Sequence, residues 1–267
     1  MCYPPGARPP DLPTDLRSIS GGAGGEDVIL TSADGTKFRT YLAKARSIPG
    51  GGARDDIGVV IAPDIRGLHQ FYEELAERFA DAGVHAIAFD YFGRTAGLDK
   101  RMDDFPFRDH VPLTKPETIQ ADIRAATAHL MATTGAKRIF VLGFCMGGRV
   151  AFNASADQKG LAGVVGFYGR LGARPGEEGN TPADRAKKMT APVLALMGGA
   201  DPGIPETDVR TFEKALNDAK VKSHVEIYAG APHSFFDRTF AEHKDACDDA
   251  WRRALGFMRT GDPAARA

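Results

Sequence analysis

The chain has 267 residues, of which 34 are lysine or arginine and 35 are aspartate or glutamate, giving a formal net charge of −1. This near balance excludes the basic excess that phosphate neutralisation requires, so we expect neither a nucleic-acid partner nor a membrane-surface partner. We also expect no transmembrane segment, because no apolar stretch approaches membrane-spanning length. The length suits one α/β domain with a sizeable core.

The cysteines indicate a reducing environment. Cys2, Cys145 and Cys247 are odd in number and widely spaced, which argues against a disulfide framework and against a zinc-ligand pair. Residues 1–6 lack the apolar core of a signal peptide, so we expect a cytoplasmic location. The chain has no His-Glu-x-x-His motif, dinucleotide-binding glycine fingerprint or P-loop, and we therefore expect no metal and no other cofactor.

Composition predicts a single domain with flexible ends. Residues 1–25 are rich in proline and glycine and predict a mobile N-terminal arm, whose removal is expected to leave the stability almost unchanged. Residues 261–267 predict a flexible C-terminal end. The domain itself is expected to span residues 26–260.

Strand and helix patterns alternate along this domain. Residues 28–30 and 38–42 flank Asp34-Gly35 and predict a β-hairpin. The continuous apolar run 57–62 is typical of a strand buried on both faces. Apolar periodicity predicts the remaining elements, which are a helix ending at Gly83, a strand at 84–89, a helix from about 114, strands at 138–142, 161–167 and 192–197, a helix at 206–217, a strand at 224–228 and a last helix carrying Trp251. This alternation predicts the α/β class, with a mostly parallel central sheet flanked by helices on both faces.

The most informative motif is Gly143-Phe144-Cys145-Met146-Gly147-Gly148, which lies between the strand pattern 138–142 and a helical pattern. A strand, a sharp turn bearing a nucleophile and a helix make a nucleophile elbow. Such a turn strains the backbone of the nucleophile and lifts its reactive atom above the sheet edge. Gly143 and Gly147 let the strand and the helix approach closely. We interpret Cys145 as a nucleophilic thiol; the alternative is a small buried hydrophobic residue, the commonest role of a free cysteine.

A thiol nucleophile needs a base, and the base needs an acid that orients it. After a nucleophile elbow, the acid and then the histidine follow in sequence. Asp201 comes after the strand at 192–197 and His233 comes after the strand at 224–228, so both share one sheet edge with Cys145. We interpret Cys145 as the nucleophile, His233 as the base and Asp201 as the orienting acid. The alternatives are a turn that Asp201 begins and a locally bonded loop histidine.

At this point the chain resembles the dienelactone hydrolase family, a cysteine branch of the α/β-hydrolases, over about residues 26–260. Besides the three residues above, the resemblance rests on four segments, which are Ala62-Pro63-Asp64-Ile65-Arg66-Gly67-Leu68, Phe89-Asp90-Tyr91-Phe92-Gly93-Arg94, Gly166-Phe167-Tyr168-Gly169 and His233-Ser234-Phe235. It implies an α/β-hydrolase fold and a carboxylic ester or lactone hydrolase of class EC 3.1.1 that forms an acyl-enzyme on Cys145. It also implies an oxyanion hole made by the backbone N–H groups of Met146 and Ile65.

The resemblance implies further residues around the thiol. Asp64 stands where the family has a glutamate that contacts the resting thiol; the alternative is that Asp64 caps the following turn. Arg94 matches an arginine that binds a substrate carboxylate. The family's second arginine lies four residues after the histidine, where this chain has Asp237, and Arg238 follows one residue later. Arg238 is therefore one candidate partner of Arg94, and Arg66 and Arg170 are further candidates nearby.

Aromatic residues and long connections complete the expected pocket. Tyr91 and Tyr168 are expected to line it, with core packing as the alternative. Residues 95–115 and 170–190 are long polar connections at strand ends, and they predict a rim or a partial lid.

The sequence thus favours a cysteine-dependent hydrolase that acts on a small-molecule ester or lactone. A thioesterase or another acyl-transfer enzyme on the same triad is an alternative. A non-catalytic ligand-binding protein of the same fold and a redox sensor at Cys145 are further alternatives. The sequence does not specify the physiological substrate or the oligomeric state, for which a monomer is slightly favoured.

Overall fold

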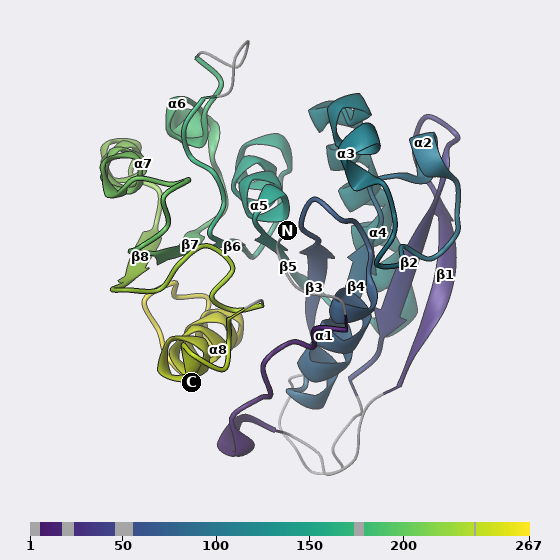
Figure 1. Cartoon of the computed structure of the whole chain (residues 1–267), viewed down its shortest axis with the longest axis horizontal. Helices are drawn as coiled ribbons and strands as arrows, with labels where there is room; N and C mark the ends of the chain where they lie inside the picture. Colours follow the sequence, from purple (N-terminus) through teal and green to yellow (C-terminus); the bar gives the residue numbers. More distant parts are fainter. Residues whose placement is uncertain (1–5, 18–23, 46–55, 174–178, 238) are drawn as a thin grey trace.

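The computed structural model describes residues 6–17, 24–45, 56–173, 179–237 and 239–267. Its centre is an eight-stranded sheet in the order β1-β2-β4-β3-β5-β6-β7-β8 (Figure 1). The strands are β1 (Gly25–Thr31), β2 (Lys37–Ala43), β3 (Ile57–Ala62), β4 (His85–Phe89), β5 (Arg138–Phe144), β6 (Gly163–Phe167), β7 (Val193–Gly198) and β8 (Ser223–Tyr228). β2 pairs antiparallel with β1 and β4, and every other neighbouring pair is parallel. The prediction of a mostly parallel sheet is confirmed.

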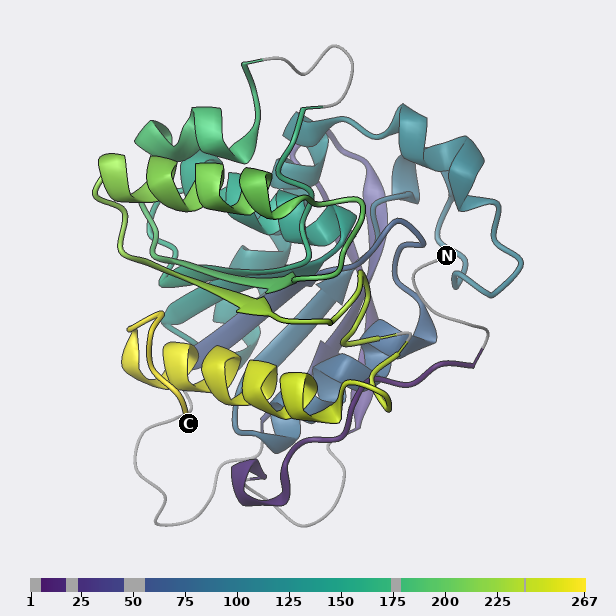
Figure 2. The ribbon, with the colours of Figure 1, turned by 60° about the vertical axis from the view of Figure 1, so that its left-hand side comes forward.

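Helices cover both faces of this sheet, as predicted. They are α1 (Gln70–Asp81), α2 (Gly93–Ala96), α3 (Phe107–His110), α4 (Pro116–Thr134), α5 (Met146–Asp157), α6 (Pro182–Arg185), α7 (Glu206–Asp218) and α8 (Lys244–Thr260), with 3₁₀ turns η1 (Thr14–Leu16), η2 (Val111–Leu113) and η3 (Ala186–Lys188). Figure 2 shows α1 and α8 on one face and α4, α5 and α7 on the other. The rings of Phe79 in α1 and Trp251 in α8 lie 5.0 Å apart and join the two helices of the first face.

The buried centre of the sheet fixes the position of the strand ends. β3, β4 and β7 are buried at every residue, as expected for parallel strands that helices cover on both faces. Because β5, β6, β7 and β8 are neighbours and parallel, their carboxyl ends meet at one edge. Among the described residues, none of the helices is both long and apolar enough to cross a membrane.

The two long connections contain short elements that the sequence analysis missed. The segment 95–115 includes the end of α2, then α3 and η2, and the segment 170–190 includes α6 and η3. Helices of three or four residues are too short to show a 3.6-residue apolar period, so periodicity cannot reveal them.

The predicted N-terminal arm is wrong for residues 6–17, which pack on the domain. Leu12 and Leu16 are each 4% exposed and belong to the main hydrophobic core. Asp15 accepts hydrogen bonds from the Arg252 guanidinium of α8 at 2.7 and 2.9 Å. Composition misled here because two leucines four residues apart bury enough apolar surface to order a proline-rich segment. Residues 1–5 and 18–23 lie outside the described part of the chain.

The C-terminal end also departs from its expected flexibility. The backbone N–H of Ala267 donates to the carbonyl of Arg252 at 2.8 Å, so the last residues fold back on α8. Gly261 ends α8 in a left-handed conformation with φ of 76° and turns the chain toward that contact.

We therefore expect removal of residues 1–17, or the single change Leu16→Ala, to lower the stability. Losing a buried leucine side chain costs about 2–3 kcal/mol, which corresponds to a fall in Tm of about 5 °C for a chain of this size. Thermal unfolding followed by circular dichroism measures this change. Asp11→Ala is the control, since the Asp11 side chain is 81% exposed in its ion pair with Arg78. An unchanged Tm for Leu16→Ala would show that the segment does not contribute to the core.

Candidate active site

Cys145 lies in a strained turn between β5 and α5. Its φ of 54° and ψ of −112° place a non-glycine residue in a sparsely populated conformation. A Cβ added to Gly143 would lie 2.0 Å from the carbonyl oxygen of Gly147, and one added to Gly147 would lie 2.0 Å from that of Ala62. Both positions therefore require glycine, as the motif predicts. The side chain of Cys145 is partly exposed at this turn.

Asp201 and His233 form a hydrogen-bonded pair. Asp201 follows β7, His233 follows β8, and their Oδ2 and Nδ1 atoms are 2.6 Å apart. The other Asp201 oxygen accepts a hydrogen bond from the Gly203 N–H at 2.8 Å, so both carboxylate oxygens are engaged. A carboxylate at Nδ1 favours the tautomer with its proton there, which leaves Nε2 available as a base.

The end of β6 connects this pair to the nucleophile. The backbone N–H of Cys145 donates to the carbonyl of Phe167 at 3.0 Å. The next residue, Tyr168, has its ring centroid 5.0 Å from that of His233. The structure therefore gathers Cys145, His233 and Asp201 around one sheet edge, although their catalytic roles stay predictions.

The two backbone amides predicted to receive an oxyanion belong to Met146 and Ile65. Met146 is the first residue of α5, so its N–H has no partner within the helix. The close approach of Gly147 to Ala62 brings the loop after β3, which carries Ile65, next to this helix start. Within the described part of the chain, neither the Met146 nor the Ile65 N–H donates to a protein acceptor. The N-terminal field of α5 also favours negative charge at this point.

Asp64 and Tyr91, both predicted to lie near the thiol, are buried. An Asp64 oxygen accepts a hydrogen bond from the Arg66 N–H at 2.8 Å, so the turn-capping alternative for Asp64 is confirmed. The Tyr91 hydroxyl donates to the Pro63 carbonyl at 2.5 Å. Burial raises the pKa of Tyr91, and the nearby charges of Asp64 and Cys145 raise it further. A direct contact between Asp64 and Cys145 stays a prediction.

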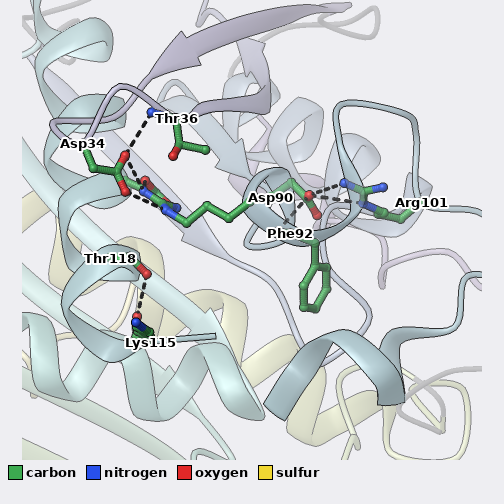
Figure 3. A network of polar contacts seen from close by, with 9 residues as sticks. Asp34, Thr36, Asp90, Phe92, Arg101, Lys115 and Thr118 are labelled. Atoms are coloured by element: carbon green, nitrogen blue, oxygen red, sulfur yellow. Dashed lines mark hydrogen bonds and ion pairs between the residues drawn. The ribbon is translucent and has the colours of Figure 1, made fainter. Parts of the chain in front are cut away.

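Arg94, which we expected to bind a substrate carboxylate, is bound by carboxylates of the protein itself. Its guanidinium donates to the buried Asp122 carboxylate of α4 at 2.6 and 2.9 Å. It also donates to Asp34 of the β1–β2 turn at 2.9 and 3.2 Å, in the network that Figure 3 shows. The Arg94 hydrogen bond lowers the pKa of Asp34 to about 2. The protein's own carboxylates therefore occupy this arginine, which spacing along the sequence could not reveal.

Tyr168 and Asp237 form a second internal pair. Tyr168 is fully buried, and its hydroxyl donates to an Asp237 oxygen at 2.9 Å. Asp237, where the family resemblance places an arginine, thus holds the tyrosine whose ring lies beside His233. Tyr91 and Tyr168 are both buried, so they pack in the core, which was the alternative to lining the pocket. Arg238 lies outside the described residues.

A buried ion pair that the sequence analysis missed holds the loop after β3. One Asp90 oxygen accepts a hydrogen bond from the Leu68 N–H at 3.0 Å, and the other accepts from Phe92 N–H and from Arg101 at 2.9 Å (Figure 3). The Arg101 guanidinium lies 4.8 Å from the Phe105 ring. Asp90 therefore connects the loop that carries Ile65 to the end of β4 and to the rim. Asp90 and Arg101 are eleven residues apart in the sequence, and this spacing gives no recognisable signal from which the ion pair could have been predicted.

Cys247 differs from Cys145 in being a buried, neutral thiol. It lies in α8, and its Sγ donates to the Phe235 carbonyl at 3.4 Å. Burial raises the pKa of Cys247 to about 12. A thiol with this pKa stays protonated below about pH 11, so it is a poor resolving cysteine for a redox switch at Cys145.

We expect iodoacetamide at pH 8 to leave Cys247 unmodified in the folded protein and to modify it in urea, where the pKa returns to its ordinary value. Peptide mapping by mass spectrometry measures both states, with the partly exposed Cys145 as the internal comparison. Rapid modification of Cys247 without urea would contradict its burial.

Comparison with known proteins gives consistent matches. A family model described as the dienelactone hydrolase family matches residues 22–261. A predicted carboxymethylenebutenolidase of Yersinia pestis is 30% identical over 205 residues, which cover 75% of this chain and 76% of the relative. A second predicted carboxymethylenebutenolidase, from Saccharolobus solfataricus, is 26% identical over an alignment that covers 88% of this chain and 98% of the relative. A crystal structure of a predicted dienelactone hydrolase from Klebsiella pneumoniae superimposes with a TM-score of 0.74 and 26% identity, covering 88% and 99% of the two chains.

Proposed function

The chain belongs to the dienelactone hydrolase family, and we propose that it is a cysteine-dependent hydrolase of small, uncharged carboxylic esters or lactones. The enzyme class, a carboxylic ester hydrolase, follows from the family and its carboxymethylenebutenolidase relatives. The observation that carries the cysteine mechanism is the 2.6 Å hydrogen bond between His233 and Asp201 at the same sheet edge as the strained Cys145.

The acylation step uses the residues gathered at that edge. The Cys145 thiolate attacks the carbonyl carbon and forms a C–S bond, while the carbonyl electrons move onto oxygen. The N–H groups of Met146 and Ile65 donate to this oxyanion, and losing one such donor costs about 3–4 kcal/mol of transition-state stabilisation. When the carbonyl reforms, the C–O bond breaks and protonated His233 gives its proton to the leaving alcohol.

Deacylation returns the enzyme to its starting state. A water molecule attacks the thioester while His233 accepts one of its protons, and the C–S bond then breaks to release the acid and to restore the Cys145 thiolate beside protonated His233. Asp201 stabilises the imidazolium that forms in both steps. With a lactone, the leaving oxygen stays attached to the acyl group, so the product is a single ring-opened acid.

The state of Arg94 supports the choice of uncharged substrates. Four of its five N–H donors already bind Asp122 and Asp34, so most of the expected carboxylate anchor is occupied. A substrate carboxylate would compete with Asp34 and with the buried Asp122, and displacing Asp122 would leave a buried carboxylate without its charged partner at a cost of several kcal/mol. The cytoplasmic location stays a prediction.

Replacement of the nucleophile tests the proposal. We expect Cys145→Ala to lower kcat for p-nitrophenyl acetate by about 10³-fold or more, because the acyl-enzyme cannot form. Cys145→Ser should fold but lose most activity, because the surrounding groups suit a thiol. Cys247→Ala is the matched control and should retain the wild-type rate. Near-full activity of the Cys145→Ala variant would rule out this mechanism.

The Asp90–Arg101 pair gives a second test, in which Asp90 is a positioning residue. Asp90→Asn keeps an oxygen for the Leu68 N–H but loses the charge that holds Arg101. We expect kcat to fall about tenfold with KM nearly unchanged, because the Ile65 N–H acts only on the transition-state oxyanion. The assay is run well below the measured Tm of the variant. A rise in KM with unchanged kcat would contradict this role.

A further inference from the structure

A cavity of about 420 Å³ lies beside the proposed nucleophile and has no role in the mechanism above. Its lining residues come from η2 and the start of α4 on one side and from α5 on the other. Its volume falls in the range of small-molecule sites. The residues that give it its chemical character are Val111, Pro112, Ile119, Met146, Val150 and Asn153.

The cavity adjoins the proposed active site at Met146, which lines it and directly follows Cys145. The side chain of Met146 lines the cavity, whereas its backbone N–H is the proposed oxyanion donor and Cys145 precedes it. Met146, Val150 and Asn153 stand at positions i, i+4 and i+7, so they share one side of α5. The cavity therefore runs along α5 from the residue after the proposed nucleophile to Asn153.

The walls of the cavity are mostly apolar and carry no carboxylate. The Gln120 side chain donates to the Val150 carbonyl at 3.2 Å and accepts a hydrogen bond from Gln158 at 2.8 Å, so it joins α4 to α5 beneath the cavity. Arg149 is the charged lining residue, and its guanidinium donates to the carbonyls of Arg170 and Gly172 at 3.1 and 2.9 Å. These contacts direct its charge toward the segment after β6.

One polar atom of the lining lacks a partner. The Oδ1 atom of Asn153 is buried and accepts no hydrogen bond from the described residues. Buried acceptors are satisfied in the great majority of folded proteins, so this oxygen is suited to a donor on a bound molecule. A hydroxyl or an amide N–H at the end of an apolar chain supplies such a donor.

We propose that this cavity binds an uncharged, mainly apolar chain of the ester substrate whose far end carries a hydrogen-bond donor for Asn153. The inference rests on the proposed function for the position of the ester group at Cys145. Each methylene that enters an apolar cavity improves binding by about fourfold at most, so chain length is expected to raise kcat/KM.

The test compares p-nitrophenyl acetate with p-nitrophenyl hexanoate, and methyl acetate with hexyl acetate, so that both sides of the ester are examined. We expect the wild type to prefer the longer chain by about tenfold or more in one of the two series. Val150→Phe and Val111→Phe fill the cavity from opposite walls and should lower that preference about tenfold. Thr211→Phe, on the exposed side of α7, is the size-matched control. An unchanged preference in a folded filling variant would overturn the proposal.

The donor is tested on the side of the ester that shows the length effect. In the acyl series, p-nitrophenyl 6-hydroxyhexanoate is compared with the hexanoate, and in the alcohol series 6-hydroxyhexyl acetate is compared with hexyl acetate. The wild type should favour the hydroxylated ester, and Asn153→Ala should lose this preference by about tenfold. If the preference for the hydroxylated ester were the same in the wild type and in Asn153→Ala, Asn153 would not be the acceptor of this hydrogen bond.

A direct binding measurement separates the cavity from the proposed function. Calorimetry with 1,6-hexanediol should show binding to the wild type and to Cys145→Ala, and no binding to Val150→Phe. If no ester is hydrolysed but the diol binds in this pattern, the proposed function fails and the cavity assignment stands. If esters are hydrolysed but neither the diol nor chain length has an effect, the assignment fails and the proposed function stands.

Discussion

The closest backbone contact at the elbow governs the active site. Gly143, Gly147 and Ala62 meet so tightly that a single Cβ at either glycine would collide with a carbonyl oxygen. This contact holds the start of α5 against the ends of β5 and β3. It accompanies the strained conformation of Cys145 and brings the loop that carries Ile65 next to the start of α5. The stored strain is tolerated because the buried parallel strands on both sides cannot shift.

Around this centre the protein uses several charged groups internally. Arg94 is held by Asp122 and Asp34, and Tyr168 is held by Asp237. Two of the positions where the family resemblance implies recognition of an anionic substrate therefore support the scaffold. The neighbouring cavity along α5 is apolar and lacks carboxylates. Together these features favour neutral substrates with an apolar chain, and they distinguish the chemistry of this site from a clamp for an anionic lactone.

The sequence predicted the sheet and the central motif well because both depend on local patterns. Uninterrupted apolar runs identify buried parallel strands, and glycines two residues from Cys145 identify the elbow. It failed where the outcome depends on which side chains meet across elements. Leu12 and Leu16 are inconspicuous in a proline-rich segment, yet they reach the core. The partners of Arg94 come from a turn and a helix that are remote in the sequence. The cavity walls likewise combine residues remote in the sequence, Ile119 of α4 and Val150 of α5.

The most direct test of the central claim is to identify the acylated residue. Wild-type protein is mixed with p-nitrophenyl acetate, quenched in acid within the first turnover and digested for mass spectrometry. The account predicts an acetyl group on the peptide that carries Cys145, and no acetyl group on Cys2 or Cys247. It also predicts that the label disappears when water completes the turnover. Acetylation of another residue with turnover kinetics, or catalysis by the Cys145→Ala variant, would contradict the account.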